Sequence, residues 1–131
     1  MVCFANVCAA RRLAIGVLLP KSTGNPSLFY MLESAAAVFE RDINQNQQLL
    51  PGIKVSVRSA SAGDAEPHVA LGAATRLYSE ADKGTLVGWV GPYSTESCET
   101  THDLIRGLGQ PQISYGCISA ALSSRRRFPV R

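Results

Sequence analysis

The chain has 131 residues and a formal net charge of +3, with 46% apolar and 18% charged residues. This length is typical of one domain with a core of its own. The composition excludes that the chain as a whole is a disordered tail. No apolar run reaches the roughly 18 residues that span a bilayer, so we expect no membrane helix in this segment.

The basic residues are concentrated at the two ends of the chain. Six of the 13 lie there: Arg11, Arg12, Arg125, Arg126, Arg127 and Arg131. Between residues 13 and 124, seven Lys and Arg face ten Asp and Glu. The body of the chain is therefore mildly acidic, which disfavours a nucleic-acid partner.

The first 12 residues differ from the patterned body that follows. Cys3 and Cys8 lie in the short apolar start MVCFANVCAA, which is short for a secretory leader and lacks a basic n-region. Residues 1–12 are interpreted either as a leader remnant or as a disordered or wrongly assigned start. Residues 13–131 form the patterned part, and four cysteines are too few for a disulfide scaffold.

The first half of the body predicts a strand, a helix and a second strand. Leu13 to Leu19 is a continuous apolar run, typical of a buried strand. Ser27 is the expected N-cap of an amphipathic helix, with Glu40 and Asn44 on its solvent side. Its apolar stripe is Leu28, Leu32, Ala35, Phe39 and Ile43. Residues 53–57 alternate between apolar and polar, which indicates a strand near a sheet edge.

The second half continues this alternation of strands and helices. Pro67 begins a helix whose small face is Ala70, Ala73, Ala74, Leu77 and Ala81. Thr85 to Val90 predicts a second buried strand. Ser94 or Thr95 caps a third helix, and Pro111 to Tyr115 forms a fourth strand. The third helix has the inner stripe Cys98, Thr101, Leu104, Ile105 and Leu108.

A strand–helix unit repeated three times and closed by a strand predicts a doubly wound parallel α/β sheet. We predict the strand order 2-1-3-4. The strands at Leu13 and Thr85 are placed in the centre because they are continuously apolar, and the strand at Ile53 at the edge because it alternates.

Three polar loops follow strands at the carboxyl edge, where ligands bind in open α/β sheets. They are KSTGNPS (21–27), GPYSTES (91–97) and GCISAALS (116–123). The second leads into a helix N-terminus, a natural place for a carboxylate, phosphate or chloride. The same composition also fits ordinary turns and caps. We predict that a bound ligand contacts Ser94, Thr95, Gly116 and Ser119.

Motifs for catalysis and cofactor binding are absent. The sequence has no G-x-G-x-x-G after the first strand, no P-loop and no G-x-S-x-G elbow. His102 lies beside Glu99 and Asp103 without a nucleophile, so we assign it to a solvated helix face and His68 to an exposed helix start. Neither has metal-ligand spacing with the cysteines. The sequence therefore predicts no enzyme, metal or cofactor in this segment.

Several segments together resemble a known family. They are LAIGVLLPKSTG, LESAAAVFERDIN, LLPGIKV, VGWVGPYSTESCE and PQISYGCISAALSS with RRRFP. In order and spacing, from about Leu13 to Pro129, they are similar to the receptor-family ligand-binding region. That region is the extracellular domain of natriuretic-peptide-type receptors and membrane guanylate cyclases. It is shared with metabotropic glutamate and GABA-B receptors and with bacterial amino-acid-binding proteins.

The resemblance implies a two-lobed clamshell of the type I periplasmic-binding-protein fold. This chain would supply the first part of lobe 1, as a fragment of a longer receptor. A small-molecule or peptide ligand would bind in the cleft or at the dimer face, and lobe closure or dimer rearrangement would be the signal. The implied receptor is a homodimer on the extracellular side of the plasma membrane, anchored by downstream segments. A fragment expressed alone would be secreted.

Two turns bear on which branch of the family the chain resembles. In glutamate-type receptors, Ser and Thr side chains hold the amino acid at positions matching Gly116 and Ile118, and neither residue here supplies a hydroxyl. Natriuretic-peptide receptors carry a cysteine in the Gly-Pro loop, where Ser94 stands here. Cys98 and Cys117 instead resemble the guanylate-cyclase branch. The alternatives are a soluble periplasmic-type solute-binding protein and a class C G-protein-coupled receptor ectodomain fragment.

We also predict a disulfide between Cys98 and Cys117. Each follows one of two adjacent strands that end at the same sheet edge, where a Cα separation of about 6 Å is feasible. An extracellular location lets the bond persist. The alternative is a pair of small buried thiols in a reduced protein.

Overall fold

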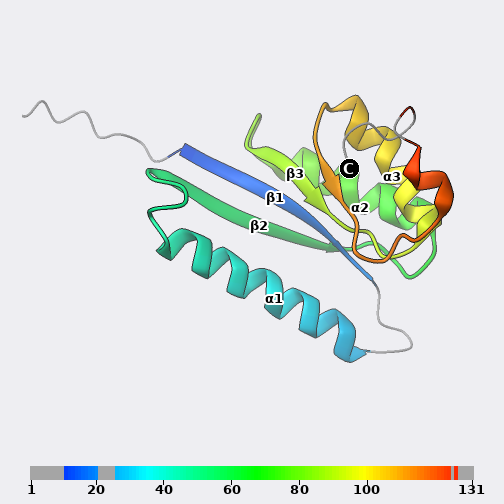
Figure 1. Ribbon diagram of the computed structural model, residues 1–131, viewed down its shortest axis with the longest axis horizontal. Coiled ribbons are helices and arrows are strands. Elements are labelled where there is room, and N and C mark those ends of the chain that lie inside the picture. Colours follow the sequence, from blue (N-terminus) through cyan, green and yellow to red (C-terminus); the bar gives the residue numbers. More distant parts are fainter. Residues whose placement is uncertain (1–10, 21–25, 125, 127–131) are drawn as a thin grey trace, which may run out of the picture.

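The computed structural model describes residues 11–20, 26–124 and 126, in which strands and helices alternate (Figure 1). The elements are β1 (Arg11–Leu19), α1 (Pro26–Gln45), β2 (Ile53–Ser61), α2 (Pro67–Glu80), β3 (Leu86–Val90), α3 (Thr95–Gly107), β4 (Gln112–Ile113) and the 3-10 helix η1 (Ala120–Ser123). The expected loop at Lys21 to Asn25 and most of the expected leader and tail lie outside the described residues.

The four strands form one parallel sheet in the order β2-β1-β3-β4. The predicted fold class and strand order are confirmed, with β2 at an edge. Helix α1 covers one face of the sheet, and α2 and α3 cover the other (Figure 1). Right-handed crossovers produce this division. The connection from β1 to β2 crosses the sheet in one direction, and the connections from β2 to β3 and from β3 to β4 cross it in the other direction. The helices of the two kinds of connection therefore lie on opposite faces.

Three local predictions are corrected. Ser27 lies inside α1, which begins at Pro26, so the predicted N-cap is wrong; proline suits a first helical turn. Strand β4 has two residues instead of five, because only Gln112 and Ile113 are aligned with residues of β3. Strand β3 is not buried throughout, since Val87 is exposed. Helix α1 covers only part of the sheet face on which it lies, so Ile15 and Val90 on that face are only half-buried.

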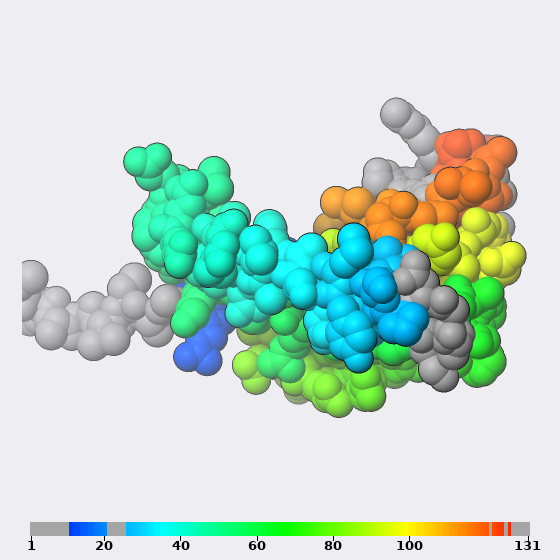
Figure 2. Space-filling view, turned by 90° about the horizontal axis from the view of Figure 1, so that it is seen from below, coloured from blue at the N-terminus to red at the C-terminus, as the bar shows by residue number. Residues whose placement is uncertain are grey.

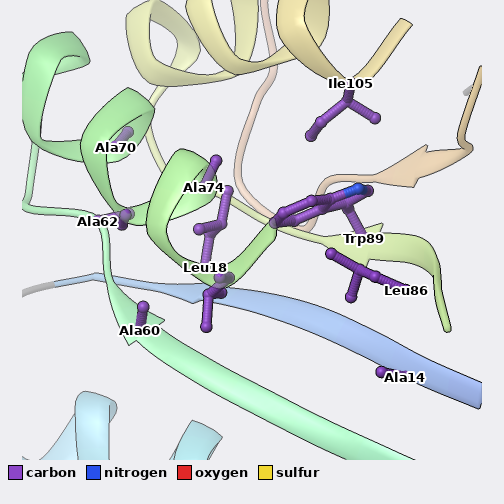
Figure 3. Packing of buried hydrophobic residues seen from close by; sticks show 11 residues of the cluster. Ala14, Leu18, Ala60, Ala62, Ala70, Ala74, Leu86, Trp89 and Ile105 are labelled. Carbon is purple, nitrogen blue, oxygen red and sulfur yellow. The ribbon is translucent and has the colours of Figure 1, made fainter. Parts of the chain in front are cut away.

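The core lies between the sheet and the helix pair α2–α3, around Trp89 (Figure 3). The buried indole packs on Gly16 of β1, where an added Cβ would lie 2.6 Å from the ring. Its Nε1 donates a hydrogen bond to Gln110 Oε1 at 2.6 Å, and Gln110 Nε2 donates to the Leu86 carbonyl. The predicted small face of α2 is confirmed, since Ala70, Ala73, Ala74 and Leu77 are buried. Small residues let α2 approach the sheet closely.

Two side chains of α1 occupy the outer edge of β2. Asn44 Nδ2 donates to the Val55 carbonyl at 2.7 Å, and the Val55 N–H donates to Asn44 Oδ1 at 2.8 Å. One turn earlier, Glu40 Oε2 accepts from the Val57 N–H at 2.8 Å. The predicted solvent side for Glu40 and Asn44 is therefore wrong. They satisfy backbone groups that an edge strand otherwise offers to other chains.

The contact between Gly16 and Trp89 gives a paired test. Gly16→Ala should lower the free energy of unfolding by about 1–3 kcal/mol, because the methyl group has no room beside the indole. Gly72→Ala is the matched control, because its added Cβ meets nothing within 4 Å and its helix gains about 0.5–1 kcal/mol. Urea unfolding of both variants measures the difference. Equal stabilities would contradict the packing described here.

Candidate functional site

The loop after β3 approaches the end of β1 very closely. Gly91 has φ +94°, and an added Cβ would lie 2.3 Å from the Leu18 carbonyl oxygen, so glycine is required by conformation and by space. The Gly91–Pro92 peptide is cis. The Gly91 N–H donates to the Ile113 carbonyl at 2.7 Å, which extends the β3–β4 pairing into the loop.

The N-terminus of α3 follows this loop and is capped by Ser94, one of the two predicted caps. Ser94 Oγ accepts a hydrogen bond from the Ser97 N–H at 3.3 Å and donates to Ser97 Oγ at 2.9 Å. Thr95 is the first helical residue, and Glu96 places a carboxylate in the first turn. The hydroxyl of Ser94 is thus engaged by its own helix, whereas Thr95 is half-exposed beside it.

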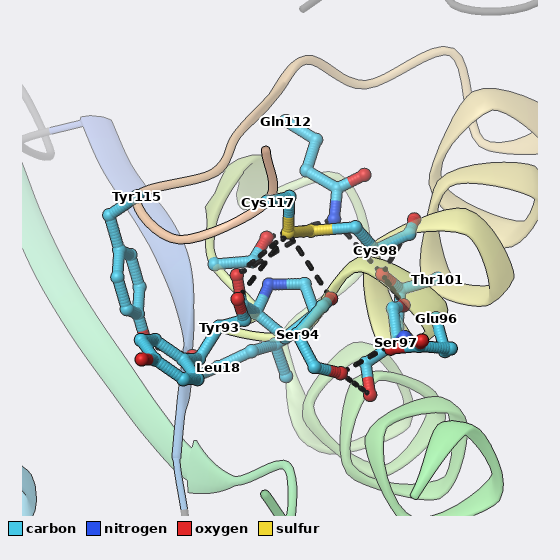
Figure 4. Close-up of a disulfide and its surroundings, with 12 residues drawn as sticks. Leu18, Tyr93, Ser94, Glu96, Ser97, Cys98, Thr101, Gln112, Tyr115 and Cys117 are labelled. Carbon is cyan, nitrogen blue, oxygen red and sulfur yellow. Dashed lines mark hydrogen bonds between the residues drawn. A yellow bond between two sulfur atoms is a disulfide. The ribbon is translucent and has the colours of Figure 1, made fainter. Parts of the chain in front are cut away.

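The turn after β4 folds back on the loop after β3 (Figure 4). An added Cβ at Gly116 would lie 2.5 Å from the Tyr93 carbonyl oxygen, so Gly116 permits the close approach of the two loops. The rings of Tyr93 and Tyr115 have centroids 6.4 Å apart. Tyr115 donates from its hydroxyl to the Leu18 carbonyl at 2.9 Å. Burial, and then Tyr93, raises the pKa of Tyr115 from 10.0 to about 12, which keeps this donor protonated.

Cys98 and Cys117 form a disulfide between these loops, with Cα atoms 6.5 Å apart (Figure 4). Cys117 Sγ lies 3.2 Å from the Ser94 carbonyl oxygen and 3.3 Å from the Pro92 carbonyl oxygen. A disulfide sulfur has no proton, so these are packing contacts. Leu122 of η1 packs against the buried Cys98. The disulfide therefore holds the β4 turn against the first turn of α3.

A buried amide also connects the two strands to α3. Gln112 Nε2 donates to the Gly91 carbonyl at 2.8 Å and to Thr101 Oγ1 at 3.0 Å. Thr101 Oγ1 donates to the Ser97 carbonyl at 2.7 Å. The sequence pattern did not predict this role of Gln112. The available signal was an amide side chain inside the predicted strand 111–115, since such a residue must find partners when buried.

The expected position of His102 is wrong. Its side chain is buried, with only 4% exposed, on a helix that packs closely against α2 and whose Ile105 joins the core around Trp89. The buried stripe of α3 is Ser97, Cys98, Thr101, His102 and Ile105. It keeps three members of the predicted inner stripe, whereas the other two, Leu104 and Leu108, are only half-buried. His68 lies exposed near the start of α2, as expected. Within the described ranges, no three His, Cys, Asp or Glu side chains form a group that could hold a metal ion.

The structure brings together the loops that carry the predicted site residues. Ser94 contacts Cys117 through its carbonyl, and Gly116 packs on Tyr93. Ser119 lies just before η1, where its carbonyl accepts from the Leu122 N–H at 3.1 Å. We name the rim formed by residues 91–97 and 114–119 the β3–β4 rim. It offers the Thr95 hydroxyl, the α3 N-terminus and the exposed faces of two tyrosines.

The family model described as "Receptor family ligand binding region" matches residues 32–131. A search of curated proteins found no match to the chain. None of the helices in the described ranges has both the length and the apolar character required to cross a bilayer.

The disulfide gives a chemical prediction. In protein secreted from an oxidising compartment, Cys98 and Cys117 should resist alkylation until a reductant is added, as measured by intact mass and peptide mapping. Closing a loop with a sequence separation of 19 should contribute about 3 kcal/mol to the free energy of unfolding in the chain-entropy model. Two alkylated cysteines at these positions in unreduced protein would contradict the pairing and weaken the extracellular assignment.

Proposed function

The chain belongs to the receptor family ligand-binding region, and on that premise we propose that it is part of lobe 1 of an extracellular domain that senses a ligand at the β3–β4 rim. The ligand is a small molecule or a peptide. Binding is converted into a signal by lobe closure or by rearrangement of a dimer. In this proposal the segment itself is not an enzyme, and any catalytic domain lies elsewhere in the receptor.

One observation carries the proposal: two loops at the carboxyl edge are fixed to each other before any ligand arrives. The Cys98–Cys117 disulfide joins them covalently, and Gln112 ties both strands to α3. Preorganisation of this kind reduces the entropy lost on binding. The rim also lies outside the strand ends, which is where open α/β sheets bind ligands.

The groups on the rim favour an anionic or hydrogen-bond-accepting part of a ligand. Thr95 supplies a hydroxyl at the N-terminus of α3, where the helix dipole favours negative charge. Ser94 contributes mainly as the cap, because its Oγ is already bonded to Ser97. Gly116 contributes by allowing the loops to meet. With no hydroxyl at Gly116 or Ile118, the amino-acid binding mode of glutamate-type receptors is disfavoured.

We assign the receptor to the guanylate-cyclase branch on the positions of Cys98 and Cys117. The receptor would then lie in the plasma membrane with this region outside, and it would act as a homodimer. Class C receptors and periplasmic-type solute-binding proteins are the alternatives. The transcript sequence downstream of residue 131 distinguishes them, because a kinase-like module followed by a cyclase module is expected only for the proposed branch.

The rim can be tested on this chain by backbone amide NMR, with acetate, chloride and inorganic phosphate as separate probes. At least one probe should shift the amide signals of Thr95, Glu96 and Gly116 in a saturable manner. Thr95→Ala should weaken that binding while keeping the Ser94 cap, and Ser94→Ala with Thr95→Ala should weaken it further. The combined variant also loses about 1 kcal/mol of helix stability with the cap, so its fold is checked by circular dichroism.

Thr100→Ala is the matched control for the rim variants. Thr100 lies in α3 beyond the rim, and its hydroxyl bonds the Glu96 carbonyl at 3.0 Å. Its removal should leave the probe affinity unchanged. Absence of saturable shifts at the rim amides with all three probes would count against the site, as would unchanged affinity in both rim variants.

A further inference from the structure

A polar pocket lies at the end of the sheet opposite to the β3–β4 rim. Its volume is about 320 Å³, and its walls come from the first halves of β1 and β2 and from the loop between α2 and β3. Figure 1 and Figure 2 both show the start of β1 (blue) at the same end of the molecule as the segment that leads from α1 into β2 (blue-green). The rim forms where the parallel strands end, so the strands separate it from this pocket.

Three cationic side chains line the pocket. They are Arg12 of β1 and Lys54 and Arg58 of β2. Arg12 and Lys54 are partners in the register of the two strands, so their side chains leave the same face of the sheet side by side. This face is the one that α2 covers, because Ala14, two residues after Arg12, belongs to the core beneath that helix.

Arg12 and Lys54 form a pair of like charges. Neighbouring strands lie about 4.8 Å apart, and like charges directly opposite each other destabilise a strand pair. Both side chains are exposed, and no carboxylate of the described residues forms an ion pair with either of them. An anion bound between the two side chains would remove this repulsion.

We propose that the pocket binds a tetrahedral oxyanion, phosphate or sulfate, that is carried as an ester on a small molecule. The Arg12 guanidinium offers a planar fork of donors suited to such an oxyanion, and Lys54 adds a compact positive charge. Ser56 lies half-buried between the two strands, and its hydroxyl contacts the Leu13 carbonyl at 3.5 Å. Hydroxyl hydrogen bonds are normally shorter, so this donor is free to turn toward a ligand.

The size of the pocket favours an ester over a free ion. About 320 Å³ is more than one oxyanion fills, and it lies at the lower end of the range for small-molecule sites. Beside the cations, the lining contains Leu13, Ala14 and Val55. These apolar groups would contact the carrier, while the oxyanion lies at the cations.

The other charged groups of the pocket leave it positive. Three cations and the two carboxylates of Glu40 and Asp82 give the lining a net charge of +1. Glu40 Oε2 accepts from the Val57 N–H at 2.8 Å, so part of its charge is compensated at the edge of β2. Arg58 Nη1 donates to the Glu80 carbonyl at 3.3 Å, which holds this guanidinium against the end of α2. Asp82 is therefore the main group that opposes an anion.

The inference goes beyond the proposed function, because the pocket shares no lining residue with the β3–β4 rim. Backbone amide NMR of the full chain tests it, with phenyl phosphate, phenyl sulfate, inorganic phosphate and inorganic sulfate as separate probes and phenol as the uncharged control. At least one ester should shift the amide signals of Leu13, Val55 and Thr85 in a saturable manner and bind more tightly than its inorganic ion. The tighter of the two esters identifies the oxyanion, and phenol should cause no shift.

Charge variants test the roles of the cations. Arg12→Gln and Lys54→Gln should each weaken binding about three- to tenfold, because each removes a charge-assisted contact at an exposed site. Asp82→Asn should strengthen binding about twofold, because it removes the opposing carboxylate. A gain in affinity cannot result from damage to the fold, and the Asp82 carbonyl that accepts from Thr85 Oγ1 at 2.7 Å stays in place.

Arg106→Gln is the matched control, because Arg106 is an exposed arginine of α3 that does not line the pocket. It should leave the affinity unchanged. Absence of saturable shifts at the pocket amides with both esters would overturn the proposal, as would unchanged affinity in both Arg12→Gln and Lys54→Gln. Inorganic ions that bind as tightly as the esters would overturn the assignment to a small molecule. Thr95→Ala should leave the pocket shifts unchanged, so failure of the rim and failure of the pocket give different results.

Discussion

The close approach of Gly91 to the end of β1 is the constraint on which the rest of the site depends. A side chain at this position would collide with the Leu18 carbonyl oxygen, and the same oxygen accepts the hydroxyl of Tyr115. The Gly91 N–H donates a hydrogen bond to the Ile113 carbonyl, and the Gly91 carbonyl accepts one from Gln112 Nε2. One glycine thus lets β1, β3 and β4 end together, and the disulfide then joins the two loops that emerge there.

Most of the fold could be predicted because it depends on local periodicity. Continuous apolar runs placed two strands in the centre, and the alternation at Ile53 placed a third at the edge. Chain order also placed Cys98 and Cys117 on neighbouring loops. By contrast, Ser27 failed as a cap because Pro26 already begins the helix, a competition that the capping pattern alone did not resolve.

The parts that could not be predicted depend on contacts between elements. Asn44 and Glu40 look like solvent-facing helix residues until β2 is placed beside them. His102 is buried on a helix that packs against α2, a contact between elements that the local pattern does not contain. Gln112 gained its role from Thr101 and Gly91, which are distant in sequence. In the candidate site, the sequence pattern predicted which loops lie together. It did not predict that the Ser94 hydroxyl is already hydrogen-bonded within α3, whereas the Thr95 hydroxyl beside it can contact a ligand.

The central claim is that the loops after β3 and β4 form one preorganised unit. Amide hydrogen exchange of the oxidised chain with Gln112→Ala tests it most directly, because this change removes the buried amide and leaves the disulfide in place. We predict that residues 91–98 and 112–119 lose protection together, while α1 and β2 keep theirs. Loss of protection confined to residues 112–119, with the loop after β3 unchanged, would contradict the account.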